Sequence, residues 1–246
     1  ETRDNIVAAN AATNLLEEIE CFSTIQIKQG RKKFDGTGKN TRCNKQLSSP
    51  DASENSQLQI DFCRSPLPKL LFEECIDLFE RNMGLMYENS SWGLNLKEKK
   101  DEINHKDARF LIVTGPPCDE TIKEFAQIDE QIVSDKAAMT KDLNQQGDTY
   151  GRRCLVAFAH FRFELDDEEF PTDEVLYLYE IQIDKDFQRC GVGHSLVSMM
   201  EAIAIKYEMK KVMLTVFKSN NLAMNFYLNK MDYIIDDCSP SNYEDG

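Results

Sequence analysis

The chain has 246 residues, of which 41% are hydrophobic, and this is enough to build the core of one large domain with additions. Its 29 basic and 43 acidic residues give a formal net charge of −14 at pH 7, which argues against nucleic acid as a partner and fits either a cationic partner or a merely solvated surface. No apolar run approaches the roughly 20 residues of a membrane span, and no secretory signal pattern is visible, so we expect no membrane partner and a location inside the cell.

The N-terminal part, residues 1–57, is predicted to be an accessory helix followed by a mobile linker. Apolar residues recur at helical spacing over residues 4–20, and Asp4 can cap the first turn. This helix is expected to dock its apolar stripe onto the core. A basic run at 28–33 fits a solvated turn better than a nuclear signal. Residues 35–57 are rich in Gly, Asn, Ser and Asp, a composition typical of mobile segments.

The main domain is predicted to span residues 58–238, with 239–246 as a C-terminal tail. Its first half should contain a strand at 58–62 that ends before Pro66, a helix at 70–83, and strands at 109–114 and 154–163. The last two strands would pair, but the 115–153 insertion between them is too long for a hairpin turn, and its apolar spacing suggests one or two helices. Tyr87 and Trp92 either close the core or form one wall of a pocket.

The second half should contain, in order, an acidic loop at 164–174, a central strand at 175–183, a glycine loop, a helix carrying Leu196 to Tyr207, a strand at 212–217, a helix capped by Asn220 and a last strand at 233–235. Strands that alternate with helices in this way imply an α/β (α+β) fold with a mixed sheet. The acidic loop could attract a basic peptide.

The glycine loop, Gln188-x-x-Gly191-x-Gly193, lies between the central strand and a helix start. The first N–H groups of a helix have no intrahelical partner and attract anions, and glycine lets the backbone approach a phosphate closely. Both a phosphate-binding loop and an ordinary strand-to-helix turn fit this pattern.

The cysteines and histidines form no metal-binding motif. The eight cysteines at 21, 43, 63, 75, 118, 154, 190 and 238 include no Cys-x-x-Cys pair, and His105, His160 and His194 stand apart. We therefore predict no metal and, because no secretory signal is visible, reduced thiols rather than disulfides.

The glycine loop, followed by a strand and Asn220-x-x-Ala223-x-x-x-Tyr227, resembles the acetyl-CoA signature of the GNAT acetyltransferase superfamily. Within it, Val175-Leu-Tyr-Leu-Tyr-Glu-Ile-Gln, Met209-Lys-Lys-Val-Met-Leu-Thr-Val-Phe-Lys and Ile235-Asp-Asp-Cys-Ser-Pro-Ser resemble the D-type N-alpha-acetyltransferases, which acetylate the N-terminal serine of histone H4 and histone 2A. His160-Phe-Arg-Phe and Met86-Tyr-Glu-x-Ser-x-Trp-Gly support this. The resemblance covers roughly residues 58–241, apart from the insertion.

The resemblance implies a GNAT fold with a splayed pair of strands that binds acetyl-CoA. The pyrophosphate would lie on the backbone of residues 188–193, the pantetheine arm would pair with residues 182–184, and Asn220 would contact that arm. The implied cofactor-binding residues are Gln182, Ile183, Asp184, Gln188, Arg189, Cys190, Gly191, Val192, Gly193 and Asn220. Because the family uses both Tyr179 and Glu180, whereas strict alternation would place them on opposite faces, a bulge is expected in the central strand.

The resemblance also implies the chemistry and the substrate. Glu180 would act as the general base, Tyr179 would lie beside it in the active site, and Tyr227 occupies the position of the family's proton donor. The start of a histone tail, Ser-Gly-Arg-Gly, would contact Tyr87, Trp92, Glu164, Asp166, Tyr177, Tyr179, Thr215 and Cys238. The enzyme would be a monomer of the nucleus and cytoplasm. Two alternatives remain: an acetyltransferase for lysine or small amines, and a non-catalytic acyl-CoA-binding module.

Overall fold

The computed structural model describes residues 4–18, 24–26, 32–34, 40–42, 57–116, 153–166, 173–239 and 242. The chain divides into two compact units, residues 1–213 and 214–246. The helices are α1 (Asp4–Ala11), α2 (Leu15–Glu18), α3 (Lys69–Glu88), α4 (Leu96–Ile103), η1 (Lys185–Phe187, 3₁₀), α6 (Val192–Lys206) and α7 (Asn221–Lys230). The strands are β1 (Thr24–Gln26), β2 (Lys32–Phe34), β3 (Asn40–Arg42), β4 (Gln57–Arg64), β5 (Arg109–Gly115), β6 (Cys154–Leu165), β7 (Glu174–Ile183) and β8 (Lys211–Leu214).

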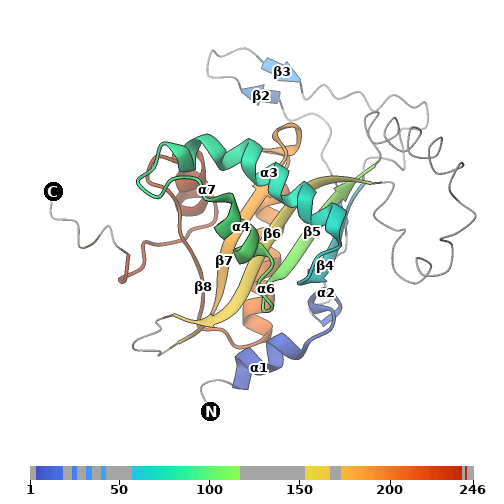
Figure 1. Ribbon diagram of the computed structural model, residues 1–246, viewed down its shortest axis with the longest axis vertical. Coiled ribbons are helices and arrows are strands. Elements are labelled where there is room, and N and C mark those ends of the chain that lie inside the picture. The colour runs from blue at the N-terminus through green and yellow to red at the C-terminus, as the bar shows by residue number, and fades with distance from the viewer. Residues whose placement is uncertain are drawn as a thin grey trace, which may run out of the picture. The chain divides into compact units, whose positions relative to one another are not determined.

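A six-stranded sheet in the order β1-β4-β5-β6-β7-β8 forms the centre of the fold (Figure 1). From β1 to β7 every neighbouring pair is antiparallel. The Lys210 N–H, just before β8, donates to the Glu174 carbonyl at the start of β7 (2.7 Å), so these two strands begin at the same end of the sheet and run parallel. The predicted mixed sheet with flanking helices is therefore confirmed.

Helices cover both faces of this sheet (Figure 1). On one face, α3 and α4 pack Phe79 and Ile103 against Phe110 and Phe158, and all four side chains are buried. On the other face, α6 buries an apolar stripe, and Tyr207 at its end contacts Phe163 of β6. Because β5 is covered on both sides, all seven of its residues are buried, as expected for an inner strand.

The prediction of one continuous helix over residues 4–20 is wrong, because the structure has two helices there, α1 and α2. The break is at Asn14, whose Oδ1 accepts from the Leu16 N–H (3.1 Å) and whose Nδ2 donates to Glu17 (2.9 Å), so the side chain starts a new helix. The predicted docking is confirmed: Ala9 and Leu15 are fully buried. Arg64 and Arg109 both donate to the Asn10 carbonyl near the end of α1.

Two further differences concern α4 and the C-terminal region. The sequence prediction missed α4, a mostly charged helix whose cap, Asn95, accepts from the Glu98 N–H (3.3 Å). The predicted last strand at 233–235 is wrong. The Tyr233 N–H donates instead to the Tyr227 carbonyl at the end of α7, and Ile234 is 87% exposed. An exposed isoleucine gains nothing from strand burial, so this segment remains irregular.

Several predictions fall outside the described residues, namely the helices of the 115–153 insertion, most of the 35–57 linker, and most of the tail after residue 239. The domain boundaries therefore stay predictions. None of the described helices is both long enough and apolar enough to cross a membrane.

Candidate active site

The site is organised by a β-bulge in β7. His160 of β6 pairs with Glu180, but the next residue, Phe161, pairs with Leu178, which leaves Tyr179 as an extra residue between them. A bulge of this kind lets two successive side chains reach the same face of a sheet. The Tyr179 ring stacks on His160 (centroids 5.2 Å apart), and Glu180 contacts α4 on that same face. The bulge expected from the sequence is confirmed.

The Glu180 carboxylate is buried, with only 8% of the residue exposed. Its Oε2 accepts from Lys99 Nζ (3.2 Å) and its Oε1 accepts from Gln182 Nε2 (2.6 Å). Burial raises the pKa of Glu180 above its ordinary value, while Lys99 and Gln182 oppose that rise. A carboxylate with a raised pKa binds a proton more readily at neutral pH, which suits a general base.

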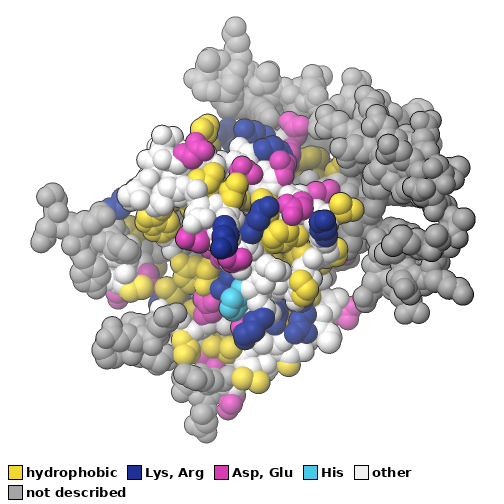
Figure 2. Space-filling model, viewed as in Figure 1, with side chains coloured by type: hydrophobic (Ala, Val, Ile, Leu, Met, Phe, Trp, Pro, Cys, Tyr) yellow, Lys and Arg dark blue, Asp and Glu magenta, His cyan; other side chains and the backbone are white. Residues whose placement is uncertain are grey.

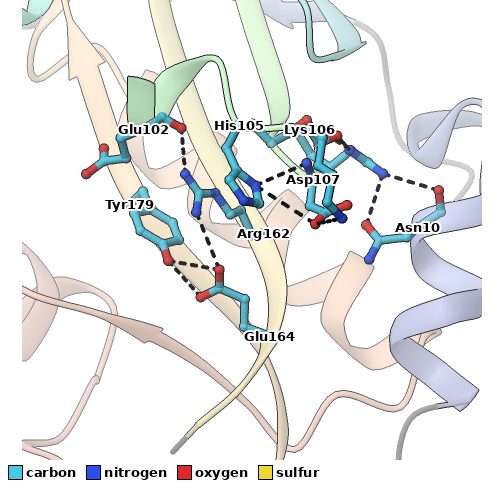
Figure 3. Close-up of polar contacts among 10 residues, drawn as sticks. Asn10, Glu102, His105, Lys106, Asp107, Arg162, Glu164 and Tyr179 are labelled. Atoms are coloured by element: carbon cyan, nitrogen blue, oxygen red, sulfur yellow. Dashed lines mark hydrogen bonds and ion pairs between the residues drawn. The ribbon is translucent and has the colours of Figure 1, made fainter. Parts of the chain in front are cut away.

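A second cluster surrounds the Tyr179 hydroxyl (Figure 3). The hydroxyl donates to the Glu164 carboxylate, with 2.8 Å to each oxygen, and the Arg162 guanidinium lies over the tyrosine ring, 4.2 Å from its centroid. Arg162 Nη1 also lies 3.7 Å from Glu164 Oε1. Burial, followed by the hydrogen bond to Glu164, raises the pKa of Tyr179, so this side chain stays a neutral phenol. Tyr177 continues the row, with ring centroids 4.8 Å from Tyr179.

The two carboxylates predicted to hold a substrate arginine both have partners within the chain. Glu164 binds Tyr179 and Arg162, as described above. Asp166 Oδ2 lies 3.6 Å from Lys211 Nζ, and its Oδ1 accepts from the Asp173 N–H (3.1 Å), closing the base of the acidic loop. A substrate cation would therefore join or replace existing contacts, and the clamp remains a prediction.

The glycine loop follows β7 after the short helix η1. Asp184 caps η1 by accepting from the Asp186 N–H (3.0 Å), and Gln188 Nε2 donates back to the Ile183 carbonyl (3.1 Å). Gly191 caps α6 in the left-handed conformation, at φ 95°, and a Cβ added to it would meet no atom within 4 Å. The backbone thus turns into α6 beside open space, with the helix's first N–H groups unpaired within the helix. This arrangement fits a bound pyrophosphate.

Helix α3 supports both the end of β7 and the site. Asn82 Nδ2 donates to Gln182 Oε1 (2.9 Å) and to the Ile183 carbonyl (3.0 Å), so the last two residues of β7 are held from one side. Tyr87 lies near the helix end, with its ring centroid 5.6 Å from Lys99 Nζ. Burial and the neighbouring Glu180 raise the pKa of Tyr87. Tyr87 therefore belongs to the same cluster as the general-base candidate, whereas Trp92 is 69% exposed.

The remaining predicted residues lie in the second unit or in the loop. Asn220 caps α7, accepting from the Ala223 N–H (3.1 Å) as predicted. Tyr227 is buried, with its ring 5.6 Å from that of Tyr233. Thr215 and Cys238 are exposed, and Cys238 Sγ lies 3.0 Å from Asp236. In the loop, Cys190 Sγ contacts the Gln188 carbonyl (3.5 Å).

The sequence prediction missed Lys99 and Glu102 of α4. Their three-residue spacing and the Asn95-x-x-Glu98 capping pattern indicate a helix, but nothing in the sequence points to Glu180, which lies 81 positions after Lys99. The sequence prediction also gives His160 no place in the site, yet this side chain is fully buried beside Tyr179. Among the described residues, no group of three or more potential ligands could hold a metal ion.

The fold and site define a class of protein with a mixed sheet flanked by helices. One strand of the sheet is bulged and carries a buried carboxylate, and this strand is followed by a glycine loop and a helix. Residues 118–233 match the sequence model of the Acetyltransferase (GNAT) family. The part of the chain that carries most of this site is therefore similar to the GNAT acetyltransferases, a family that uses acetyl-CoA.

The chain is also similar to several solved structures. An aminoglycoside acetyltransferase from an uncultured soil metagenomic sample is 14% identical (73% of this chain, 91% of that chain, TM-score 0.43). A putative acetyl transferase from Pyrococcus furiosus is 14% identical (72% and 95%, TM-score 0.42). A ribosomal-protein-alanine N-acetyltransferase from Brucella melitensis biovar Abortus 2308 is 11% identical (74% and 95%, TM-score 0.39).

Proposed function

We propose that the protein is an N-alpha-acetyltransferase that moves the acetyl group of acetyl-CoA to the N-terminal serine amine of basic protein tails beginning Ser-Gly-Arg-Gly, the start of histone H4 and histone 2A. The observation that carries the proposal is the buried Glu180 carboxylate. It is brought beside Tyr179 by the bulge, three positions before β7 ends at Ile183 and eight positions before the glycine loop begins at Gln188.

The chemistry required of Glu180 is modest. An N-terminal amine has a reference pKa of about 8, so near neutral pH one proton must be removed for the amine to attack a thioester. As the amine nitrogen bonds to the acetyl carbon, the carbon–sulfur bond breaks and Glu180, directly or through water, takes that proton. A protonated Tyr179 cannot act as this base, so the proposal assigns the role to the buried carboxylate of Glu180.

The cofactor would be held by the loop and the end of β7. Backbone N–H groups of Gln188 to Gly193 would bind the pyrophosphate, and Gln182 to Asp184 would pair with the pantetheine arm. The splaying of β7 from β8, the contact with Asn220 and proton donation by Tyr227 remain part of the proposal.

The choice of a basic tail rests on particular carboxylates. Figure 2 shows Lys and Arg side chains next to Asp and Glu on the face that carries α3 and α4, so this face does not carry a single sign of charge. Selectivity for the arginine of Ser-Gly-Arg-Gly is therefore assigned to Glu164 and Asp166, because a guanidinium between carboxylates makes short charge-assisted hydrogen bonds.

The direct test is acetylation of synthetic peptides, with mass spectrometry to locate the acetyl group. We expect transfer to the α-amine of Ser-Gly-Arg-Gly peptides and a raised KM when the arginine is replaced by alanine. Acetylation of a lysine side chain or a free small amine instead would support the rival enzyme. CoA binding without release of CoA in the presence of any of these amines would favour the non-catalytic module.

Gly191→Ala is expected to weaken CoA binding about tenfold or more. Alanine at φ 95° costs of order 1–2 kcal/mol, and relief of that strain would turn the α6 N–H groups away from the pyrophosphate. Calorimetric titration with CoA measures the change. Gly93→Ala is the matched control, since Gly93 also has positive φ (67°) and open space but lies outside the loop. Equal losses in both variants would remove the loop from the binding site.

A further inference from the structure

The Lys99 side chain is placed unusually for a lysine. It comes from the charged helix α4, yet it is only 7% exposed. Its ammonium donates to Glu102 Oε1 (2.7 Å) and to Glu180 Oε2 (3.2 Å), and it lies 4.9 Å from the Phe79 ring centroid and 5.6 Å from that of Tyr87. Two carboxylates and two aromatic faces therefore enclose the charge.

Stability alone does not account for this arrangement. Moving an ammonium and a carboxylate out of water is costly, and apolar residues of similar volume often stabilise a fold equally well or better. An apolar residue at position 99 would, however, leave the Glu180 carboxylate buried without a cation. Glu180 has a second donor, Gln182, but that amide carries no charge.

We infer that Lys99 is a positioning residue for Glu180: its ammonium holds the carboxylate in one orientation and in its anionic form, ready to accept a proton. The inference rests on the proposed acetyl transfer for its functional meaning. Lys99 itself touches neither substrate nor cofactor in this role. Glu102 orients the ammonium from the other side and balances part of its charge.

The charged and titratable groups around Glu180 determine the direction of the effect. They are Tyr87 from α3, Lys99 and Glu102 from α4, His160 and Arg162 from β6, and Tyr179 from β7. Burial alone lowers the pKa of Lys99, but the two carboxylates outweigh burial and raise it, so the ammonium stays charged. Burial, Arg162 and Lys99 lower the pKa of His160, which is therefore neutral at pH 7. Lys99 is thus the cation in direct contact with Glu180.

Lys99→Met removes the charge and keeps much of the volume. The pKa of Glu180, already raised by burial, should rise further, because an opposite charge this close lowers a carboxyl pKa by about one to three units. A general base works only when ionised, so the acidic limb of the pH–rate profile should move to higher pH by about one to three units. Lys99→Arg keeps the charge and should restore most of the wild-type profile. If the acidic limb of the pH–rate profile stays at its wild-type pH in Lys99→Met, the inference is overturned.

A second measurement keeps the test independent of activity. In protein labelled with ¹³C at the glutamate carboxyl, the Glu180 signal is the one that Glu180→Gln removes, and its titration should follow the same shift in Lys99→Met. If the protein acetylates none of the peptides, the proposed function fails while this titration still decides the role of Lys99.

Glu102→Gln covers the case in which Lys99→Met does not fold. It removes a negative charge near Glu180 and leaves the ammonium to a single carboxylate, so the titration of Glu180 should move to lower pH, opposite to Lys99→Met. A shift to higher pH, or no shift, would show that the cluster does not control the charge of Glu180.

Discussion

Replacing Glu180 with glutamine is expected to lower the rate of acetyl transfer by about two to four orders of magnitude, the range typical of a lost general base. Glutamine has nearly the same shape, and its one side-chain oxygen can keep one of the two hydrogen bonds that Lys99 and Gln182 donate, but an amide does not accept the proton that the attacking amine must lose. The affinity for CoA should stay within a few-fold of wild type, because the glycine loop is unchanged. Steady-state release of CoA gives the rate, and calorimetric titration gives the affinity.

The matched control is Glu73→Gln. Glu73 is an exposed glutamate on α3 that forms an ion pair with Lys100, so its substitution should leave the rate and the CoA affinity unchanged. A Glu180→Gln enzyme with wild-type turnover across the acidic pH range would remove Glu180 from the mechanism. A parallel loss of CoA affinity would instead indicate that the carboxylate supports the cofactor site.

Truncating Leu78 to alanine is expected to lower the free energy of unfolding by about 2–5 kcal/mol, the range found for buried leucines. Leu78 lies on α3, is 1% exposed, and packs in the cluster between this helix and the sheet. Its removal leaves a cavity under the helix that holds Asn82 and Tyr87. Urea denaturation followed by circular dichroism measures the change.

Leu85→Ala supplies the comparison on the same helix. Leu85 is 76% exposed, so the same substitution should change the free energy of unfolding by no more than about 0.5 kcal/mol. Because both variants alter helix propensity equally, the difference between them isolates burial. A similar cost at the two positions would contradict the packing of α3 on the sheet.

Much of this fold could be predicted because the spacing of apolar residues within a single strand or helix indicates that element. Alternating apolar residues identified β4 and β7, a continuous apolar run identified β5, and helical spacing identified α3. Asn220 could be recognised as a cap because a cap depends only on residues within one turn of it. The bulge at Tyr179 was predicted from a conflict between side-chain alternation and the resemblance to a family that uses two successive residues.

The rest of the site depends on contacts between distant parts of the chain. Two of the bonds in the site, Lys99 to Glu180 and Tyr179 to Glu164, join residues on different elements. No repeat in the sequence relates the positions of the two partners. Helix α4 carries only two apolar residues, Leu96 and Ile103, which are too few for apolar spacing to identify a helix of eight residues. The final strand was predicted wrongly because Tyr233 to Ile235 have high strand propensity, whereas in the structure the chain bonds back to α7.

The bulge has a consequence for insertions and deletions. Removing one residue from a regular strand shifts every later side chain to the opposite face. In β7, however, the pairs on either side of Tyr179 already match β6 without it, so the hydrogen-bonded ladder would close over its deletion with its register intact. We therefore expect the sheet to tolerate the loss of Tyr179, whereas the candidate site would lose the stack on His160 and the bond to Glu164, so this position could separate folding from the proposed catalysis.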